Sequence, residues 1–301
     1  MINVTKMFDR IRKDWVLYLM LLPGIAYFLI FHIKPIIDMK LAFQDYRIIG
    51  DNIWVGLKHF NVLFSSPVFL DVIKNTVIIS TMKIIFVFPI PILLSLLINE
   101  INSGPYRKYI QSISYLPHFL SWVVIAGVWI SLLNPVGGGV NILRDFFQLP
   151  SLDFMTSKDH IRWVLVFSEM WRSAGWDTIL YIAAMMKISP ALYEAAKIDG
   201  ANMWQQMRHI TLPELAGTAV TVFILNLGFF MNAGFDQVFN LMNDSVISVI
   251  DILDTYVYRI GIVNGQYAYA TAASLFKGAI GLVLILSTHF ISKRFTGKGV
   301  W

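Results

Sequence analysis

Charged residues stand inside one long apolar stretch of this chain, where a charge is costly to bury. Glu169 and Arg172 are three residues apart, so on a helix they share a face and could pair, and Asp177 follows about a turn and a half later. The same stretch contains the aromatic residues Trp171, Trp176 and Tyr181. Charges in apolar spans usually face a protein interior or a water-filled cavity. The cluster could therefore line the pathway of a polar solute, or it could be a structural ion pair with tryptophans anchored at a membrane boundary.

A second polar set surrounds a later apolar stretch. Its members are Asn226, Asn232, Asp236 and Gln237. They could line the same pathway, although hydrogen bonds between helices explain them equally well. Lys83 and Lys277 are expected to snorkel or to be packed, and the lone His118 is expected to be structural.

Motifs for catalysis are not apparent in this sequence. A Gly-x4-Gly-Lys-Ser/Thr phosphate loop is missing, since Gly297-Lys298 is followed by glycine, and there is no His-x-x-x-His pair or cluster of metal ligands. The chain has no Cys, which excludes disulfides and thiolate metal sites. We therefore expect no catalytic residue, metal or cofactor on this chain, so energy for any work must come from another chain.

The composition indicates which elements position these residues. Of 301 residues, 56% are hydrophobic and only 14% are charged, which is far more apolar than an ordinary soluble domain. Stretches of about 20 mostly apolar residues can cross a bilayer. Six candidates lie at residues 16–37, 75–97, 110–133, 163–186, 215–235 and 275–291. The sequence thus predicts an all-α polytopic membrane protein with six transmembrane helices, embedded in the lipid bilayer as a single domain over residues 1–301.

The basic residues predict the orientation of these spans. They fall in short clusters at both chain ends and in the loops after the second and fourth spans: Lys6, Arg10, Arg12, Lys13, Arg107, Lys108, Lys187, Lys197, Arg208, Lys293, Arg294 and Lys298. Positive residues favour the cytoplasm, so both termini are expected there. Clusters of this kind argue against a nucleic-acid partner for the net charge of +5. The first stretch is too long for the core of a signal peptide and is expected to be a retained span.

The outer loop at residues 234–273 is too long for a simple connector. Its segment 246–258 alternates apolar and acidic positions, which is compatible with a helix on the outer surface. The loop could be a docking face for an external partner, and a lid packed on the bundle is an equal alternative.

The segment at residues 188–213 has the features of a helix, a turn and a second helix on the cytoplasmic side. Ser189 can cap a helix that begins at Pro190, and Gly200 can adopt the left-handed conformation that ends it. A second short helix is expected to stop near Pro213. Small residues would allow another surface to approach closely, although such a loop is more often an amphipathic connector resting on the membrane.

A family resemblance favours the docking role. The run Glu194-Ala195-Ala196, then Asp199-Gly200-Ala201, then Ile210, Leu212 and Pro213, resembles the coupling-helix signature of ABC importer permeases, often called the EAA loop. In that family the first helix of the loop sits in a cleft of the ATPase. The resemblance implies that these nine residues form or support the ATPase-coupling element, in a type I ABC importer permease fold. Many members have a further proline where this chain has Gly217, which leaves the start of the fifth span open.

Further motifs resemble the maltose-type carbohydrate permeases, in the branch associated with oligo- and polysaccharide uptake. They include Val55-Gly56-Leu57-Lys58, the run from Ser114 to Trp122 and the run from Asp254 to Arg259. The resemblance implies a second homologous permease, two ATPase domains that bind ATP and Mg, an extracytoplasmic solute-binding protein and a carbohydrate substrate. On this interpretation the chain is a transport subunit and not an enzyme, in the bacterial cell membrane.

Two rival interpretations belong to other classes. A secondary transporter driven by an ion gradient predicts discontinuous helices in paired inverted repeats, and no convincing repeat is visible. A structural membrane protein would use the 188–213 loop only as a connector. Transport that depends on nucleotide would separate both from an ATP-driven importer.

Overall fold

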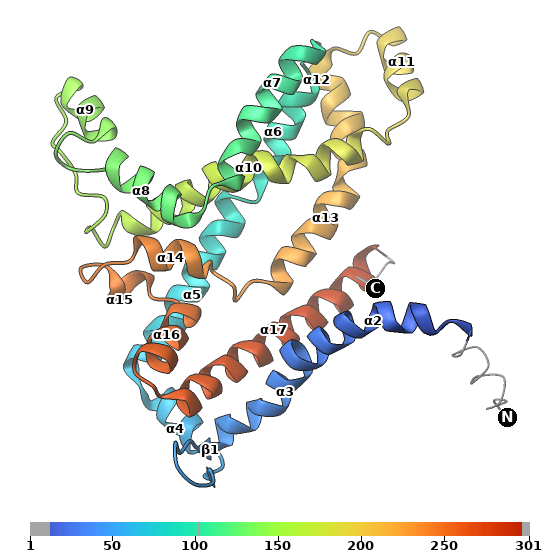
Figure 1. Cartoon of the computed structure of the whole chain (residues 1–301). Helices are drawn as coiled ribbons and strands as arrows, with labels where there is room; N and C mark the ends of the chain where they lie inside the picture. The colour runs from blue at the N-terminus through green and yellow to red at the C-terminus, as the bar shows by residue number, and fades with distance from the viewer. Residues whose placement is uncertain (1–12, 102, 297–301) are drawn as a thin grey trace.

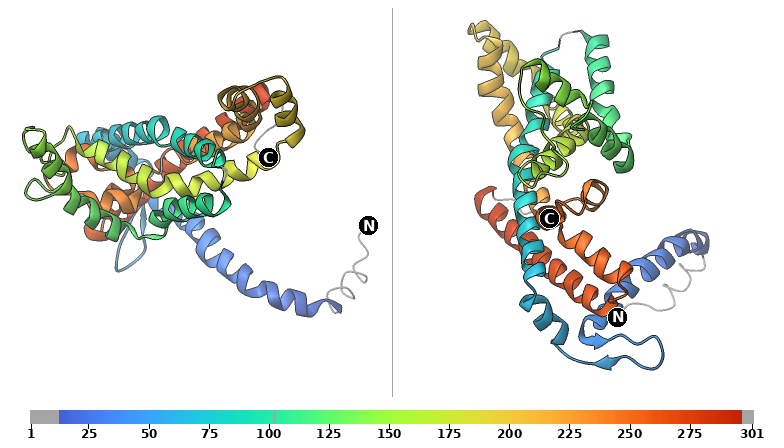
Figure 2. Two further views of the ribbon diagram at one scale, coloured as in Figure 1. Left: turned by 90° about the horizontal axis from the view of Figure 1, so that it is seen from above. Right: turned by 90° about the vertical axis from the view of Figure 1, so that its left-hand side faces the viewer.

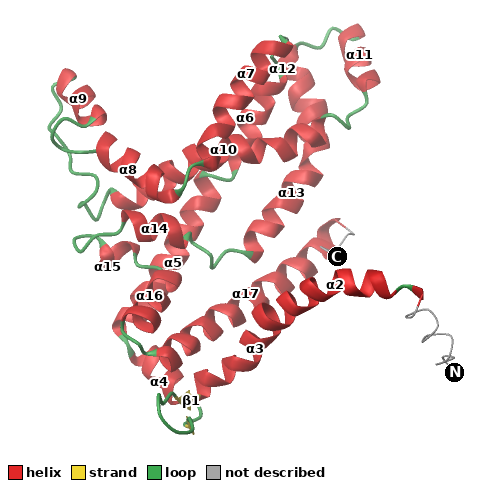
Figure 3. Ribbon diagram, in the orientation of Figure 1, coloured by secondary structure: helices red, strands yellow, loops and turns green. Residues whose placement is uncertain are grey.

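The computed structural model describes residues 13–101 and 103–296 of the chain. Of the basic residues that predict the orientation, Lys6, Arg10, Arg12 and Lys298 lie outside the described residues. The described chain is built almost entirely of helices (Figures 1 and 3). Its described strands, β1 (Gln44–Asp45) and β2 (Ile53–Trp54), pair antiparallel with Gln44 opposite Trp54.

The helices follow one another with short connections. The first half contains α2 (Trp15–Phe28), α3 (Lys34–Asp38), α4 (Lys58–Ser65), α5 (Pro67–Phe86), α6 (Pro89–Asn99), α7 (Gly104–Tyr115), α8 (Trp122–Leu132) and α9 (Gly139–Phe146). The second half contains α10 (Ile161–Met185), α11 (Pro190–Ile198), α12 (Met203–Gln206), α13 (Leu212–Gly228), α14 (Phe235–Leu241), α15 (Ile247–Ile250), α16 (Leu253–Tyr258) and α17 (Tyr267–Thr296). Wide π-helical turns at Leu29–Ile33, Met207–Thr211 and Arg259–Val263 join several of them, and tighter 3-10 turns lie at Met39–Phe43 and Leu116–Phe119.

Four helical segments among the described residues are long and apolar enough to cross a membrane. They are Trp15–Phe43, Pro67–Asn99, Met203–Gly228 and Tyr267–Phe290, and each contains or overlaps one predicted span. Helix α10 also has 25 residues. It is less apolar than the four because it contains Glu169, Arg172 and Asp177, so composition alone does not establish it as a span.

The predicted span at residues 110–133 is sharply bent in the structure. Helices α7 and α8 meet at 102°, so this region is a broken span or a re-entrant pair. The break follows from Pro117, which has no N–H to donate within the 3-10 turn, and from the extended backbone of Leu120. Ser121 then begins α8 by accepting a hydrogen bond from the Val124 N–H at 3.4 Å.

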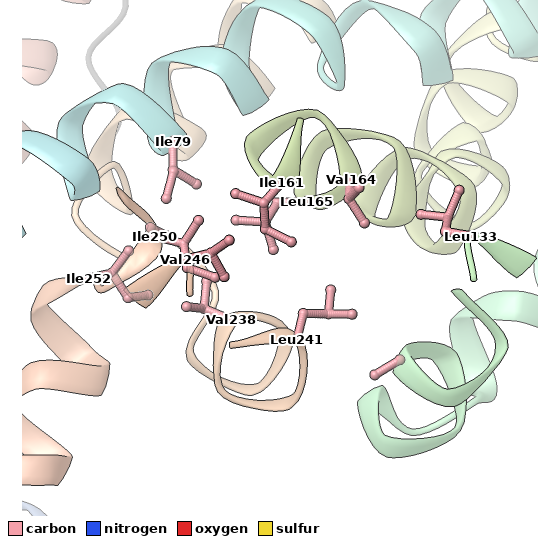
Figure 4. Packing of buried hydrophobic residues seen from close by; sticks show 12 residues of the cluster. Ile79, Leu133, Ile161, Val164, Leu165, Val238, Leu241, Val246, Ile250 and Ile252 are labelled. Atoms are coloured by element: carbon pink, nitrogen blue, oxygen red, sulfur yellow. The ribbon is translucent and has the colours of Figure 1, made fainter. Parts of the chain in front are cut away.

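The loop at residues 234–273 is packed into the bundle and is not a helix lying on the outer surface. Ile250, Ile252 and Leu253 are fully buried. Figure 4 shows Ile250 and Ile252 converging with Ile79 of α5, Ile161 of α10 and other apolar side chains. The alternating pattern therefore arises because one side of the segment faces the core, whereas a docking face for an external partner on its other side stays a prediction.

Polar contacts also hold the segment at residues 246–259 in place. Arg162 of α10 donates to the Val249 carbonyl at 3.0 Å and to the Asn75 side-chain oxygen at 2.8 Å. Within this segment, Asp251 accepts from Arg259 at 2.5 Å and from Thr255 at 2.7 Å. Buried polar groups that are paired in this way stabilise a single arrangement of the segments.

Helix α2 projects from the rest of the molecule (Figure 2). None of its residues is buried, although its sequence is strongly apolar. A helix that is apolar all round is normally covered by lipid or by other helices, so the surroundings of α2 are the membrane or another chain.

We expect Gly175→Ala to destabilise the protein, because a Cβ at Gly175 would lie 2.0 Å from the Ser114 carbonyl oxygen where α7 crosses α10. Overpacking of this kind costs about 1–3 kcal/mol. Gly217→Ala in α13 is the matched control, since nothing lies within 4 Å of a Cβ there. Thermal unfolding of the detergent-purified complex should show a lower midpoint for the first variant only. Equal midpoints for the two variants would contradict the tight helix crossing.

Candidate functional site

A cavity of about 840 Å³ lies between α5, α10, α13 and the break between α7 and α8. Its polar lining includes Ser80, Lys83, His118, Glu169, Arg172 and Asp177, and α13 and the turn after it add Asn226 and Asn232. Its aromatic lining includes Trp122, Trp176, Tyr181 and Phe229. Cavities that bind polar ring-shaped solutes combine apolar walls with a few placed polar groups, and this lining has that character.

Six of the eight residues predicted for a substrate pathway line this cavity: Glu169, Arg172, Trp176, Asp177, Asn226 and Asn232. The structure thus brings together residues from two segments that are far apart in the sequence. Trp171 points elsewhere and lines an apolar pocket with Trp129, whose ring lies 6.5 Å away. Asp236 stands in the first turn of α14, away from the cavity lining.

The partner predicted for Glu169 is wrong. Glu169 pairs with Lys83 of α5, whose ammonium nitrogen lies 3.1 Å from the carboxylate, and not with Arg172. The same ammonium donates to the Ala233 carbonyl at 2.7 Å and to the Gln237 side-chain oxygen at 2.5 Å. Lys83 is therefore packed and does not snorkel. Spacing within one helix could not reveal a partner from another helix.

The backbone at Gly234 leaves room for the Lys83 ammonium group. Gly234 has a φ of 99°, and a Cβ there would lie 2.8 Å from the Lys83 ammonium. Gln237, which is fully buried, donates in turn to the Leu165 carbonyl at 2.6 Å and to the Ser168 hydroxyl at 2.8 Å. These contacts join α5, α10 and α14 behind one wall of the cavity.

Arg172 and His118 also line the cavity. The Arg172 guanidinium carbon lies 5.1 Å from the centroid of the Trp122 ring, a cation–π contact. His118 stacks on Trp176 with centroids 4.5 Å apart and ring planes 2° apart. The sequence analysis missed Trp122 and the cavity position of His118. Pro117 was the available signal, because the helix break beside it turns both residues toward α10.

Lys277 was also expected either to snorkel or to be packed. Lys277 of α17 is packed, and its ammonium lies 2.5 Å from the Asp254 carboxylate on α16. This ion pair joins α16 to α17, and neither residue lines the cavity.

The loop at residues 188–213 presents α11 to its surroundings. No residue of α11 is buried, and Glu194, Ala195, Asp199 and Gly200 are exposed. Ala196 and Ala201 are partly buried, and the Ala201 N–H donates to the Ala196 carbonyl at 2.8 Å. Figure 1 shows α11 at the end of the molecule opposite α14 to α16.

The end of α11 is formed as the sequence predicts. Gly200 has a φ of 78°, and its N–H donates to the Lys197 carbonyl at 3.1 Å, which together with the Ala201 contact completes a Schellman motif. At the start, Ser189 occupies the N-cap position before Pro190 as predicted, but its side chain makes no cap hydrogen bond. Pro190 supplies the fixed φ of the first turn and has no N–H that needs a cap.

The second helix of the loop does not stop near Pro213. Asn202 and Gln205 begin it with reciprocal hydrogen bonds of 2.9 Å and 2.8 Å, and helix continues without a break from Met203 to Gly228. The π-helical turn at Met207–Thr211 precedes Pro213 directly. We attribute the continuity to this wide turn, because it relieves the clash between a proline ring and the preceding turn. Gly217 lies within this continuous helix, so the departure from the family pattern does not interrupt the segment.

One contact connects α11 to the base of α13. The Tyr193 hydroxyl lies 2.9 Å from the Thr211 hydroxyl, and Thr211 is only 1% exposed. Tyr193 and Ile210 also pack on an apolar cluster that contains Ile98 of α6 and Leu215 of α13. Leu212 and Pro213 are exposed beside this cluster. The loop is thereby attached to the helix whose other end lines the cavity.

Comparison with known proteins gives consistent matches. The family described as "Binding-protein-dependent transport system inner membrane component" matches residues 88–297. The polygalacturonan/rhamnogalacturonan transport system permease protein YteP of Bacillus subtilis is 42% identical over 95% of this chain and 90% of its own length. Protein LplB of the same species is 37% identical over 97% of this chain and 92% of its own length.

Solved structures match as closely. The crystal structure of a bacterial ABC transporter involved in import of the acidic polysaccharide alginate contains a chain with 40% identity and a TM-score of 0.90, which covers 97% of this chain and 99% of that one. A crystal structure of the alginate transporter in complex with an alginate pentasaccharide-bound periplasmic protein gives the same TM-score and identity, over 98% of this chain and 100% of that one. Both sequence and structure match known members over most of the chain. The chain therefore belongs to the family of binding-protein-dependent transport system inner membrane components.

Proposed function

We propose that this chain is the permease subunit of an ATP-driven, binding-protein-dependent importer of oligosaccharides. The observation that carries the proposal is α11, an exposed helix with the coupling signature that is attached through Thr211 to a long helix lining the cavity. The names of the relatives, a polygalacturonan/rhamnogalacturonan permease and an alginate importer, support a substrate derived from a polysaccharide.

In the membrane, the chain would cross six times as one permease domain, with both termini in the cytoplasm. Counting α10 and the bent α7–α8 pair with the four apolar segments gives this number. Support comes from Arg107 and Lys108, at the α6–α7 connection, and from Lys187, Lys197 and Arg208, in or beside the coupling loop. Because α11 and its basic neighbours share one side, that side is assigned to the cytoplasm.

The cavity would form half of the transport pathway. A second, homologous permease would supply the facing wall, and an extracytoplasmic binding protein would deliver the sugar. ATP and Mg would be bound by two ATPase domains on partner chains, with α11 in a cleft of one of them. Closure of the ATPases would then move α11 and, through the base of α13, the wall of the cavity.

The experiment that tests this function is uptake by the reconstituted complex. Proteoliposomes that contain both permeases and the ATPases, supplied with the loaded binding protein, should accumulate labelled oligosaccharide only when ATP is present. Equal uptake without ATP would overturn the proposal. Uptake driven by an ion gradient would favour a secondary transporter, and no uptake under any condition would favour a structural protein.

We expect the double substitution Glu194→Lys, Gly200→Val to abolish co-purification of the ATPase while the sister permease is retained. The new lysine reverses a charge on the exposed face of α11, and valine is strained at the φ of 78° that ends the helix. Affinity purification from membranes, followed by quantification of each subunit, measures the outcome.

Gly265→Val is the matched control for backbone strain. Gly265 has a φ of 71° with nothing within 4 Å of a Cβ, but it lies in the connection before α17, away from the loop. This variant should retain the ATPase. Retention of the ATPase by the double variant would contradict the docking role of α11.

We expect Tyr193→Phe and Thr211→Val to reduce transport per ATP hydrolysed while the ATPase stays bound. Each change removes one hydroxyl of the contact between α11 and the base of α13. Loss of a single hydrogen bond of this kind is worth about 1 kcal/mol, so coupling should fall by roughly fivefold. The measurement is the ratio of initial uptake to ATP hydrolysis in proteoliposomes.

Thr211→Ser keeps the hydroxyl and should preserve the coupling ratio. If all three variants lower the ratio equally, packing around Thr211 is responsible and not the hydrogen bond. If Tyr193→Phe leaves the ratio unchanged, motion reaches α13 by another contact.

A further inference from the structure

Unpaired polar atoms gather at the cavity wall. Across the described residues, four buried side-chain nitrogen or oxygen atoms have no hydrogen-bond partner, and three of them belong to residues that line this cavity: Ser80 Oγ, His118 Nδ1 and Arg172 Nε. Ser80 is only 5% exposed. A buried polar group without a partner is costly, so polar atoms left unsatisfied by the described residues are concentrated at the wall of this cavity.

The charges of the lining are not all engaged within the chain. Lys83 and Glu169 neutralise each other, and Lys83 has two further acceptors in Ala233 and Gln237. Arg172 and Asp177 make no ion pair within the described part of the chain. The free cation and the free carboxylate stand about a turn and a half apart on α10, so the wall has a positive and a negative position.

Arg172 is held in a position suited to an anion. Its guanidinium group lies over the Trp122 ring, a contact that orients the plane of the group, and its Nε has no hydrogen-bond partner among the described residues. A guanidinium binds a carboxylate through two parallel hydrogen bonds, with a geometry that an ammonium group cannot supply.

We infer that Arg172 binds the carboxylate of an acidic sugar unit, so that the cavity selects negatively charged oligosaccharides. The inference rests on the proposed function and assigns the substrate class of the same site. The exposed Trp176, fixed by its stack on His118, offers an aromatic surface for the C–H face of the ring, while the exposed Asp177 bonds its hydroxyls.

Asp177 sharpens the selection. Its charge repels a carboxylate placed beside it, so the acidic group of the sugar is directed to the Arg172 end of α10. The alginate importer, whose chain is similar to this one over nearly its whole length, is described as acting on an acidic polysaccharide, which agrees with this assignment.

Ligand binding to the purified four-subunit transporter, without the binding protein, tests the assignment directly. The probes are trigalacturonate and its methyl ester, which has the same size and no charge. We expect Arg172→Gln to weaken trigalacturonate binding by about tenfold or more and to leave the ester unchanged, because only the acid uses the guanidinium. Asp177→Asn should act in the opposite direction and tighten binding of the acid relative to the ester.

Arg172→Lys is the control that separates a direct role of the guanidinium in binding from a structural effect of the substitution. It retains the positive charge but not the paired hydrogen bonds, so it should keep a preference for the acid that is smaller than in the wild type. Parallel loss of both ligands in Arg172→Gln, or no change in either, would overturn the assignment.

Failure of this inference can be told apart from failure of the proposed function. If the wild-type complex carries oligosaccharides with ATP but Arg172→Gln leaves the ratio of acid to ester binding unchanged, only the role of Arg172 is wrong. If the wild-type complex neither binds nor carries any oligosaccharide while its ATPase is active, the proposed function itself is wrong and the inference is overturned with it.

Discussion

The partly buried Lys83 ammonium group places a demand on the segments around it. A charge that is largely withdrawn from water is costly unless the protein supplies acceptors for it. Glu169, the Ala233 carbonyl and Gln237 do so, and they come from α10, from the turn before α14 and from α14 itself. One side chain of α5 therefore fixes the relative positions of three other parts of the chain, and Gly234 allows the backbone to approach it closely.

This constraint divides the cavity wall into a fixed part and an available part. Polar groups near Lys83 are satisfied by one another, so they hold the wall in place and offer little to a solute. Arg172 and His118 line the same cavity, and each has a polar atom without a partner. The sequence alone made Glu169 and Arg172 look like partners. Only the packing of α5 against α10 shows that Glu169 is engaged elsewhere and that Arg172 is left free.

The sequence predicted what depends on local pattern and missed what depends on contacts between distant segments. Apolar length located the helices, and Gly200 was identified as the end of α11 because few other residues adopt its backbone angles. The bend beside Pro117 and the continuation through Pro213 were not predicted. A proline can end a helix, bend it or be accommodated by a π turn, and the neighbouring segments decide between these outcomes. For the same reason the position of His118 in the cavity was missed.

Helix α13 explains how a loop outside the cavity can act on it. Thr211, at its base, contacts Tyr193 of α11, and Asn226, near its other end, lines the cavity. Fifteen residues of helix separate them, which corresponds to about 22 Å. An unbroken helix transmits displacement over this distance better than a kinked one, because a kink absorbs motion by bending. Because helix continues through the π turn and past Pro213, a single helical segment connects α11 to the cavity.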